Sequence, residues 1–231
     1  MDKERALVVG TADELSAQAE GGKLRVFATR MIRILFCLLL MSSSASLAQE
    51  LAQELTQELP AHLRRMIESA HEQVGVTLYY DPSYSVISFP GGDVPMVRGV
   101  CTDVIIRAYR SVGVDLQLLV NQDMRKAFSA YPRNWGLSRP DPNIDHRRVA
   151  NLAVFFTRHG QVLPISTEAK AYRPGDIVTW RLPGGLAHIG LVSDRSTDGR
   201  LLIVHNIGAG AKVEDVLFAF TITGHYRYLP P

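Results

Sequence analysis

The chain has 231 residues, of which 46% are hydrophobic and 8% are aromatic. A chain of this length and composition is typical of one good-sized globular domain with an extension, so disorder throughout is not expected. Its 25 Lys and Arg residues nearly balance 23 Asp and Glu residues, and the net charge is +2. Because the basic residues are dispersed and form no stripe, we expect no nucleic-acid partner.

Residues 31–48 have the pattern of a secretory signal peptide. Arg33 supplies positive charge, residues 34–41 form an apolar run, and small residues end in Ser46-Leu47-Ala48, a suitable cleavage site. The apolar run is short for a bilayer span, so a permanent anchor is the weaker alternative. We therefore expect translation to start at Met31, residues 1–48 to be leader and signal, and the mature protein to be periplasmic or otherwise exported.

The two cysteines differ in their context. Cys37 lies within the apolar run and follows Phe36 rather than the small residue of a lipoprotein signal, so lipid attachment is not expected. Cleavage after Ala48 would leave Cys101 as the only cysteine, which then has no internal disulfide partner. An unpaired thiol in an oxidising compartment favours a functional role, and the alternative is an inert cysteine packed as a small hydrophobic residue.

The first part of the chain reads as helices after a lead-in. Residues 49–90 are expected to form this lead-in, with helical spacing of leucines over 49–74, a break at Pro60, and short extended pieces over 79–89. The main domain is expected over 91–231. Its apolar spacing predicts three helices, over residues 103–112, 121–130 and 147–158.

After Pro174-Gly175 the pattern changes to strands. Alternating and β-branched residues predict four of them, over residues 176–180, 188–193, 201–206 and 221–228. Helices followed by an antiparallel sheet indicate an α+β fold.

Cys101 and His188 are the candidate nucleophile and base. Cys101 lies at or beside a helix start, where unpaired amides and the helix dipole favour the thiolate, so we expect a lowered thiol pKa. His188 begins an apolar strand after a flexible Pro-Gly-Gly turn, where a sheet edge can hold its ring near the thiol. The alternative for a single histidine at a strand start is a half-exposed surface residue.

A third polar group is expected to orient His188. His205 and Asn206 end the next predicted strand, and because strand residues alternate between faces, only one of them can point toward His188. We favour His205 and keep Asn206 as the alternative.

Four motifs in this order resemble the NlpC-type branch of the papain-like cysteine peptidases, within an uncharacterised branch of exported bacterial proteins. The resemblance extends over roughly residues 99–228 and is carried by Gly99-Val100-Cys101-Thr102-Asp103, Pro174-Gly175-Asp176-Ile177-Val178-Thr179-Trp180, Ala187-His188-Ile189-Gly190-Leu191-Val192 and Ile203-Val204-His205-Asn206. It implies a papain-like fold with N-terminal helices packed on a small antiparallel sheet. It also implies a Cys-His-polar triad that cleaves amides in peptidoglycan stem peptides through an acyl-enzyme.

Two departures limit what the resemblance implies. Val100-Cys101-Thr102-Asp103 replaces the usual Asp-Cys-Ser-Gly, and a helical insertion over about 118–172 makes the substrate uncertain. Two alternatives therefore stay open: a lipid acyl hydrolase or transferase of the same fold, and a non-catalytic wall-binding module.

The insertion contains further polar and aromatic residues. Arg147 or Arg148 is expected to bind a substrate carboxylate, because a planar guanidinium matches one. Asp145 is expected to be the N-cap of the following helix, and Tyr131 and Trp135 to be core or loop anchors. No zinc-ligand spacing occurs, so neither a metal nor a cofactor is expected.

Overall fold

The computed structural model describes residues 59–229. The described residues belong to one compact unit, Leu59–Pro231. The expected signal peptide, its cleavage site and Cys37 therefore lie outside the described residues. Within the described part, no helix is long and apolar enough to cross a membrane.

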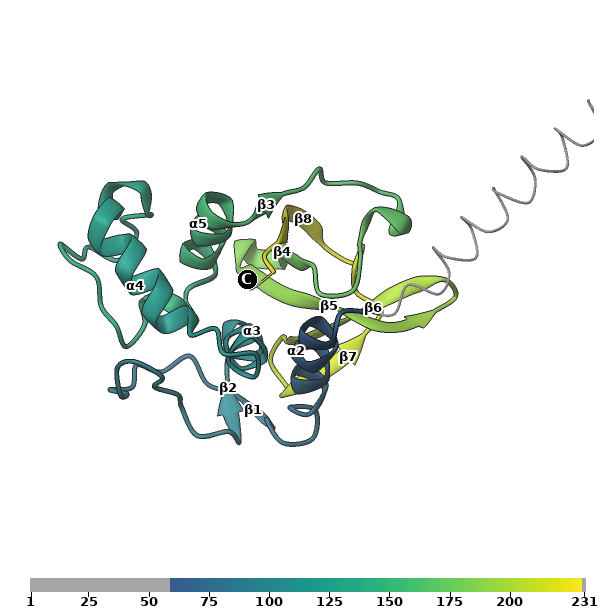
Figure 1. The fold of residues 1–231 in the computed structure, drawn as a ribbon, viewed down its shortest axis with the longest axis horizontal. Coiled ribbons are helices and arrows are strands. Elements are labelled where there is room, and N and C mark those ends of the chain that lie inside the picture. Colours follow the sequence, from purple (N-terminus) through teal and green to yellow (C-terminus); the bar gives the residue numbers. More distant parts are fainter. Residues whose placement is uncertain (1–58, 230–231) are drawn as a thin grey trace, which may run out of the picture. The chain divides into compact units, whose positions relative to one another are not determined.

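Four α-helices and four short 3-10 helices lie in the described part of the chain (Figure 1). The α-helices are α2 (Ala61–His71), α3 (Cys101–Arg110), α4 (Leu116–Ala127) and α5 (Val149–His159). The 3-10 helices are η1 (Phe128–Ala130), η2 (Asp145–Arg147), η3 (Ala169–Ala171) and η4 (Pro183–Gly185).

Helix α2 begins directly after Pro60, at the break that the sequence predicts. Leu63, Met66, Ile67 and Ala70 recur at helical spacing and are buried, so this face of the helix packs into the core. The expected lead-in therefore contributes, from Ala61 onward, to the same hydrophobic core as the residues after 91.

All three predicted helices start within a few residues of the prediction, at Cys101, Leu116 and Val149. Helix α4 begins five residues before the predicted start, because the Asp115 side chain accepts the backbone N–H groups of Gln117 and Leu118 and caps it there. Helix α5 begins at Val149, and its N-cap is Arg148. The expectation that Asp145 caps this helix is wrong, because Asp145 lies in η2 instead.

Six strands form one antiparallel sheet in the order β3-β8-β4-β5-β6-β7. They are β3 (Gln161–Val162), β4 (Ile177–Arg181), β5 (Ala187–Thr197), β6 (Arg200–Asn206), β7 (Ala211–Glu214) and β8 (Thr221–Arg227). A separate parallel pair joins β1 (Tyr79–Tyr80) to β2 (Arg98–Gly99). The mixed helix-and-sheet architecture expected from the sequence is confirmed, and all four predicted strands are present.

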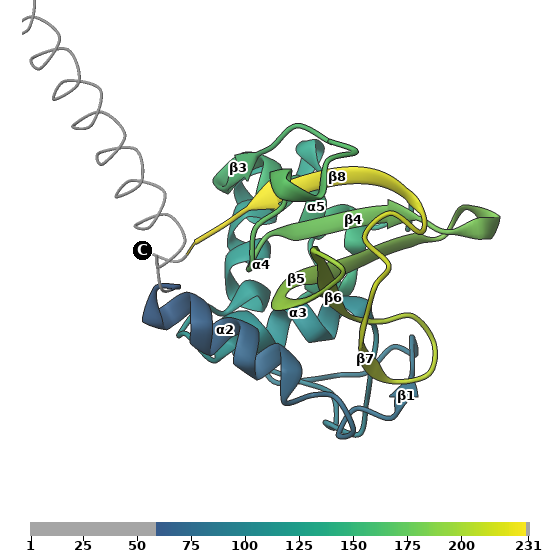
Figure 2. The ribbon, with the colours of Figure 1, turned by 90° about the vertical axis from the view of Figure 1, so that its right-hand side faces the viewer.

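The two faces of the sheet pack into two different hydrophobic clusters. One face carries Ile189, Leu191 and Val204 into the main core beneath the helices, where α3 packs on β5 and β6 (Figure 2). The other face belongs to a smaller cluster of Tyr172, Val178, Trp180, Val192, Ile203 and Leu217. The start of α3 thus lies against β5 on the Ile189 face, whereas the His188 ring lies on the other face, because His188 pairs directly with Trp180 of the smaller cluster and their ring centroids are 5.8 Å apart.

Candidate active site

Cys101 is the first residue of α3, with Val100 as the N-cap. The Asp103 side chain accepts the backbone N–H of Val100 at 2.6 Å, which fixes the turn into the helix. Thr102 anchors the same turn by donating its hydroxyl to the carbonyl of Arg147 at 2.9 Å. These contacts hold the thiol at the helix start that the sequence predicts.

The Cys101 side chain is 3% exposed, and the backbone N–H groups of Ile189 and Thr102 and the Tyr80 hydroxyl act to stabilise its thiolate. Burial raises the pKa of Cys101 to about 11, although these donors act in the opposite direction. The expected lowering of the thiol pKa is therefore wrong for the free protein, because burial outweighs the helix start. Among the contacts of residues 59–229, no hydrogen bond joins this thiol to His188.

His188, His205 and Glu214 form a continuous line of hydrogen bonds. Nε2 of His188 lies 2.8 Å from Nδ1 of His205, and Nε2 of His205 lies 2.9 Å from Oε2 of Glu214. Both rings are buried, and burial lowers the pKa of His188 to about 3. Burial also lowers the pKa of His205, an effect that Glu214 opposes. Both imidazoles are thus neutral near pH 7.

Gly190 lies where the neighbouring strands leave no room for a side chain. A Cβ at this position would lie 2.5 Å from Cγ2 of Ile203, 3.2 Å from the Trp180 ring and 3.3 Å from Cβ of His205. Any larger side chain would have to displace one of these groups. The glycine two residues after His188 therefore allows Trp180, Ile203 and the Cβ of His205 to pack closely against β5.

Asn206 points away from the histidine pair. Its Nδ2 donates to the carbonyl of Gly99 at 3.1 Å, and its Oδ1 accepts the backbone N–H of Gly208. Of the two candidates for a third residue, the structure brings His205 to His188 and places Asn206 against the strand that precedes Cys101.

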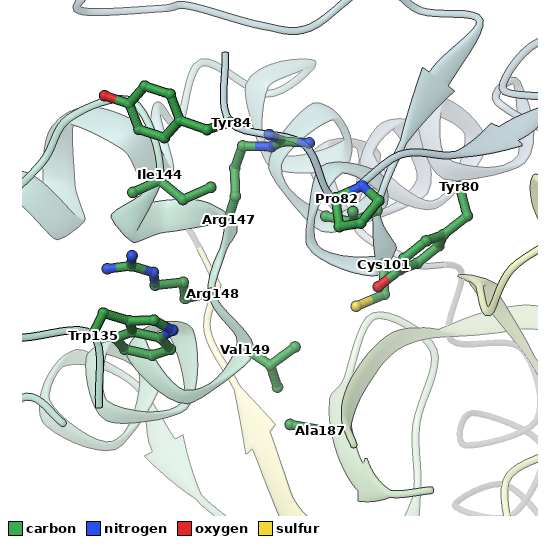
Figure 3. Close-up of a pocket in the computed structure, with 11 residues that line it drawn as sticks. Tyr80, Pro82, Tyr84, Cys101, Trp135, Ile144, Arg147, Arg148, Val149 and Ala187 are labelled. Carbon is green, nitrogen blue, oxygen red and sulfur yellow. The ribbon is translucent and has the colours of Figure 1, made fainter. Parts of the chain in front are cut away.

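Cys101 lines a cleft of about 370 Å³ (Figure 3). Tyr80 and Cys101 lie at one side of it, and Arg148 lies over the Trp135 ring at the other. The lining residues are Tyr80, Pro82, Tyr84, Val100, Cys101, Trp135, Ile144, Arg147, Arg148, Val149 and Ala187. The expectation that Trp135 only anchors the loop is wrong, since it is 41% exposed and forms a wall of the cleft. Tyr131 is such an anchor, because it is buried and donates its hydroxyl to Asp123.

The two candidate arginines have different partners. Arg147 donates from Nε and Nη2 to the Asp103 carboxylate, both at 2.9 Å, and its side chain is only 2% exposed. Arg148 donates to Asp145 at 2.8 Å and stacks on Trp135, with 3.9 Å from its guanidinium carbon to the ring centroid. Arg147 is thus committed to a buried ion pair, and Arg148 is the guanidinium better placed for a ligand.

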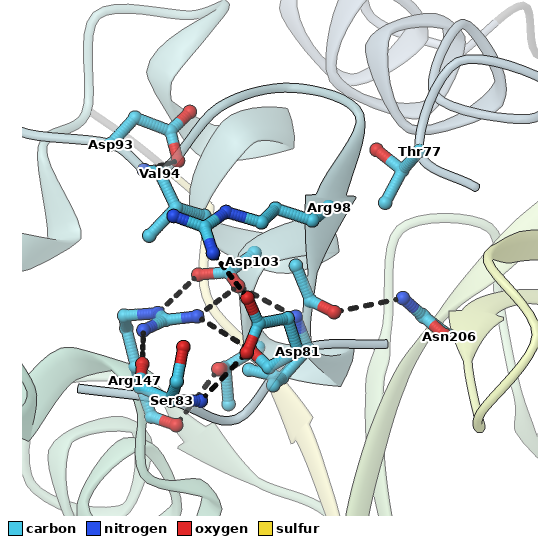
Figure 4. Close-up of polar contacts among 12 residues, drawn as sticks. Thr77, Asp81, Ser83, Asp93, Val94, Arg98, Asp103, Arg147 and Asn206 are labelled. Carbon is cyan, nitrogen blue, oxygen red and sulfur yellow. Dashed lines mark hydrogen bonds and ion pairs between the residues drawn. The ribbon is translucent and has the colours of Figure 1, made fainter. Parts of the chain in front are cut away.

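Further polar contacts fix the segment that brings Tyr80 to the cleft (Figure 4). Asp81 forms an ion pair with Arg98, and Arg147 donates to the carbonyls of Asp81 and Ser83. Arg107 of α3 forms an ion pair with Asp93 on the neighbouring loop and donates to the Thr77 hydroxyl. The segment around Tyr80 is therefore held by an ion pair to β2 and by arginine hydrogen bonds from η2 and α3.

Tyr80 and Glu214 are two site residues that the sequence did not single out. Each lies on a strand of two to four residues, too short for a recognisable alternation. Among residues 59–229, no group of three or more His, Cys, Asp and Glu side chains is arranged to hold a metal ion.

Comparisons with known proteins bear on the identity of the chain. A family model described as "Domain of unknown function (DUF1287)" matches residues 67–228. "Uncharacterized protein YijF" of Escherichia coli (strain K12) is 58% identical over 162 residues, which cover 70% of this chain and 79% of that protein.

A solved structure from Staphylococcus aureus subsp. aureus Mu50, described as similar to lipoprotein, NLP/P60 family, is 12% identical with a TM-score of 0.37. The match covers 76% of this chain and 44% of that one, so the chain spans less than half of that protein. The family match covers well over half of the chain, and the identity to YijF is high. The chain therefore belongs to the DUF1287 family.

Proposed function

We propose that this protein is an exported cysteine hydrolase of papain-like fold that cleaves an amide bond in peptidoglycan stem peptides. The observation that carries the proposal is the position of the Cys101 thiol. It lies at the start of α3, in the wall of a cleft, where the backbone N–H of Ile189 acts to stabilise the thiolate. The sequence resemblance to NlpC-type peptidases supports the same chemistry.

In the proposed reaction, a neutral thiol is activated only when substrate is bound. The His188 ring lies on the Trp180 face of the sheet in the free protein, so this step requires the ring to turn toward Cys101. A ring nitrogen of His188 then takes the proton of Cys101 while Sγ attacks the amide carbonyl carbon, which gives a tetrahedral oxyanion. His188 then gives this proton to the leaving amine, the C–N bond breaks, and a thioester remains on Cys101. A water molecule, deprotonated by His188, hydrolyses the thioester and restores the thiol.

The start of α3 and the Tyr80 hydroxyl also supply hydrogen-bond donors for the oxyanion. The backbone N–H of Cys101 is at the first helical position, where amides have no partner within the helix. Burial raises the pKa of Tyr80 to about 12, so its hydroxyl stays protonated and lies beside Sγ as a second donor. Both groups would stabilise negative charge that develops next to the thiol.

The far side of the cleft favours a peptide with a free carboxylate. Arg148 is held in the wall by Trp135 and Asp145 and offers further N–H donors beyond the one used by Asp145. Stem peptides carry both amide bonds and carboxylates, and the wall is their location, which agrees with the export proposed from residues 31–48.

Incubation of muropeptides with wild type and with Cys101→Ala, followed by chromatography and mass spectrometry, tests the proposal. We expect new fragments with the wild type only. The two fragments of each cleaved muropeptide should together have the mass of the parent plus one water molecule. The same preparations are incubated with phospholipid as a second substrate. Identical muropeptide traces together with fatty-acid release by the wild type would replace the wall peptide by a lipid substrate. No turnover of either would favour a binding module.

A further inference from the structure

Glu214 is the last residue of the short strand β7. Its carboxylate contacts His205 at the ring nitrogen that does not contact His188. Strand β7 pairs with β6 so that Lys212 lies opposite His205, and Glu214 lies two residues further on the same face. Its Oε2 lies 2.9 Å from Nε2 of His205, whose side chain is 1% exposed while that of Glu214 is 38% exposed. A buried histidine is thus joined to a solvent-accessible carboxylate.

We infer that Glu214 is a positioning residue that fixes the ring protons of both histidines and leaves Nδ1 of His188 as the basic nitrogen. The inference rests on the proposed function for its catalytic meaning, whereas the proton arrangement follows from the hydrogen bonds alone.

The proton positions follow from the one group in the line that can only accept. A carboxylate has no hydrogen to donate, so Nε2 of His205 must carry the proton of their 2.9 Å contact. In a neutral imidazole the other nitrogen is then an acceptor, so Nδ1 of His205 receives a hydrogen bond from His188. Nε2 of His188 carries that proton, and its Nδ1 keeps a free lone pair.

The reverse arrangement is unfavourable at the contact between His205 and Glu214. If Nδ1 of His205 donated to His188, the unprotonated Nε2 of His205 would face the carboxylate of Glu214 with two acceptors in contact. Burial keeps both rings neutral, so a second proton on either ring does not resolve the conflict. Without Glu214, this contact would no longer favour one placement of the ring protons over the other.

The same line favours the charged state of His188 during the reaction. When His188 accepts the proton of Cys101, its Nε2–H donates more strongly to His205, and the negative charge of Glu214 lies at the end of the line. Lys212 is the one cation paired with this carboxylate among the described residues, at 3.8 Å from its Oε1, and both groups are partly exposed. Glu214 therefore acts through His205 and does not touch the reacting atoms.

The test combines nitrogen NMR of the histidine rings with kinetics, using Glu214→Ala and Glu214→Gln. Asp215→Ala is the matched control, because Asp215 is the next carboxylate along the chain and pairs with Arg200 rather than with a histidine. In the wild type near pH 7 we expect His188 to carry its proton on Nε2, with Nδ1 unprotonated. Glu214→Ala should give a mixture of tautomers in both rings, whereas Asp215→Ala should leave the wild-type spectrum.

For turnover, carboxylates that orient metal-bound histidines typically contribute about 10- to 100-fold, and we expect Glu214→Ala to lower kcat by a similar factor with little change in KM. Glu214→Gln keeps an acceptor oxygen without the charge, so it should restore the tautomer and only part of kcat. A wild-type His188 protonated on Nδ1, or an unchanged tautomer in a folded Glu214→Ala, overturns the inference. Because the spectra need no substrate, failure of the proposed function would appear separately, as absent turnover with the expected tautomers.

Discussion

Arg147 and Asp103 form a bidentate ion pair, with two N–O distances of 2.9 Å, that ties η2 to the first turn of α3. Both side chains are almost fully buried, at 2% and 3% exposure. Asp103 also accepts the N–H of Val100, so this pair holds the turn that presents Cys101.

We expect Arg147→Ala to lower the free energy of unfolding by about 3–5 kcal/mol, because it leaves a buried carboxylate without its partner. Urea denaturation followed by circular dichroism measures this loss. Arg65→Ala is the matched control, because Arg65 pairs with Glu68 and Glu72 at the exposed surface of α2 and should be nearly neutral. Equal midpoints for the two variants would contradict the structural role of Arg147.

The alkylation of Cys101 should depend on pH in the manner of a buried neutral thiol. Since burial raises its pKa to about 11, the thiolate fraction near pH 7 is small and rises with every unit up to that value. We expect the rate with iodoacetamide to increase throughout pH 7–10, where a free thiol with a pKa near 8.5 reaches a plateau. A rate already constant below pH 7 would instead indicate a preformed thiolate.

The site residues should differ in how much activity their loss removes. Cys101→Ala and His188→Ala should abolish turnover with the fold intact. His205→Ala should retain a measurable remnant, with kcat lowered by about 10²- to 10⁴-fold, because an orienting group is only partly essential. Asn206→Ala removes the contact to Gly99 and should cost less than His205→Ala. Total loss at Asn206 with none at His205 would reverse the assignment.

Replacement of Arg148 should affect substrate binding more than chemistry. We expect Arg148→Ala to raise KM for muropeptides with a free carboxylate and to leave KM for amidated ones nearly unchanged. Arg139→Ala serves as the control, since Arg139 is an exposed arginine of the same insertion that does not line the cleft. If muropeptides with a free carboxylate and amidated muropeptides had the same KM in the wild type, and again in Arg148→Ala, a carboxylate site at this residue would be excluded.

The sequence predicted the parts of the site that depend on local pattern. The helix start at Cys101 and the strands of His188 and His205 follow from apolar spacing and turn residues, and they are present. The partners set by tertiary packing were not predictable. The pairing of Asp103 with Arg147 joins residues 44 positions apart, and Glu214 reaches His205 through a strand of four residues. Burial of the thiol likewise follows from packing, which is why its pKa moves opposite to the helix-start expectation.

The most direct test of the central claim is muropeptide hydrolysis in water labelled with heavy oxygen. If Cys101 forms an acyl-enzyme that water releases, each cleavage places one labelled oxygen in the new carboxyl group of the released fragment. We predict this label with the wild type and no labelled fragment with Cys101→Ala, measured by mass spectrometry of the same muropeptides. Labelled fragments from Cys101→Ala at the wild-type rate, or none from the folded wild type, would contradict a cysteine hydrolase acting on the wall.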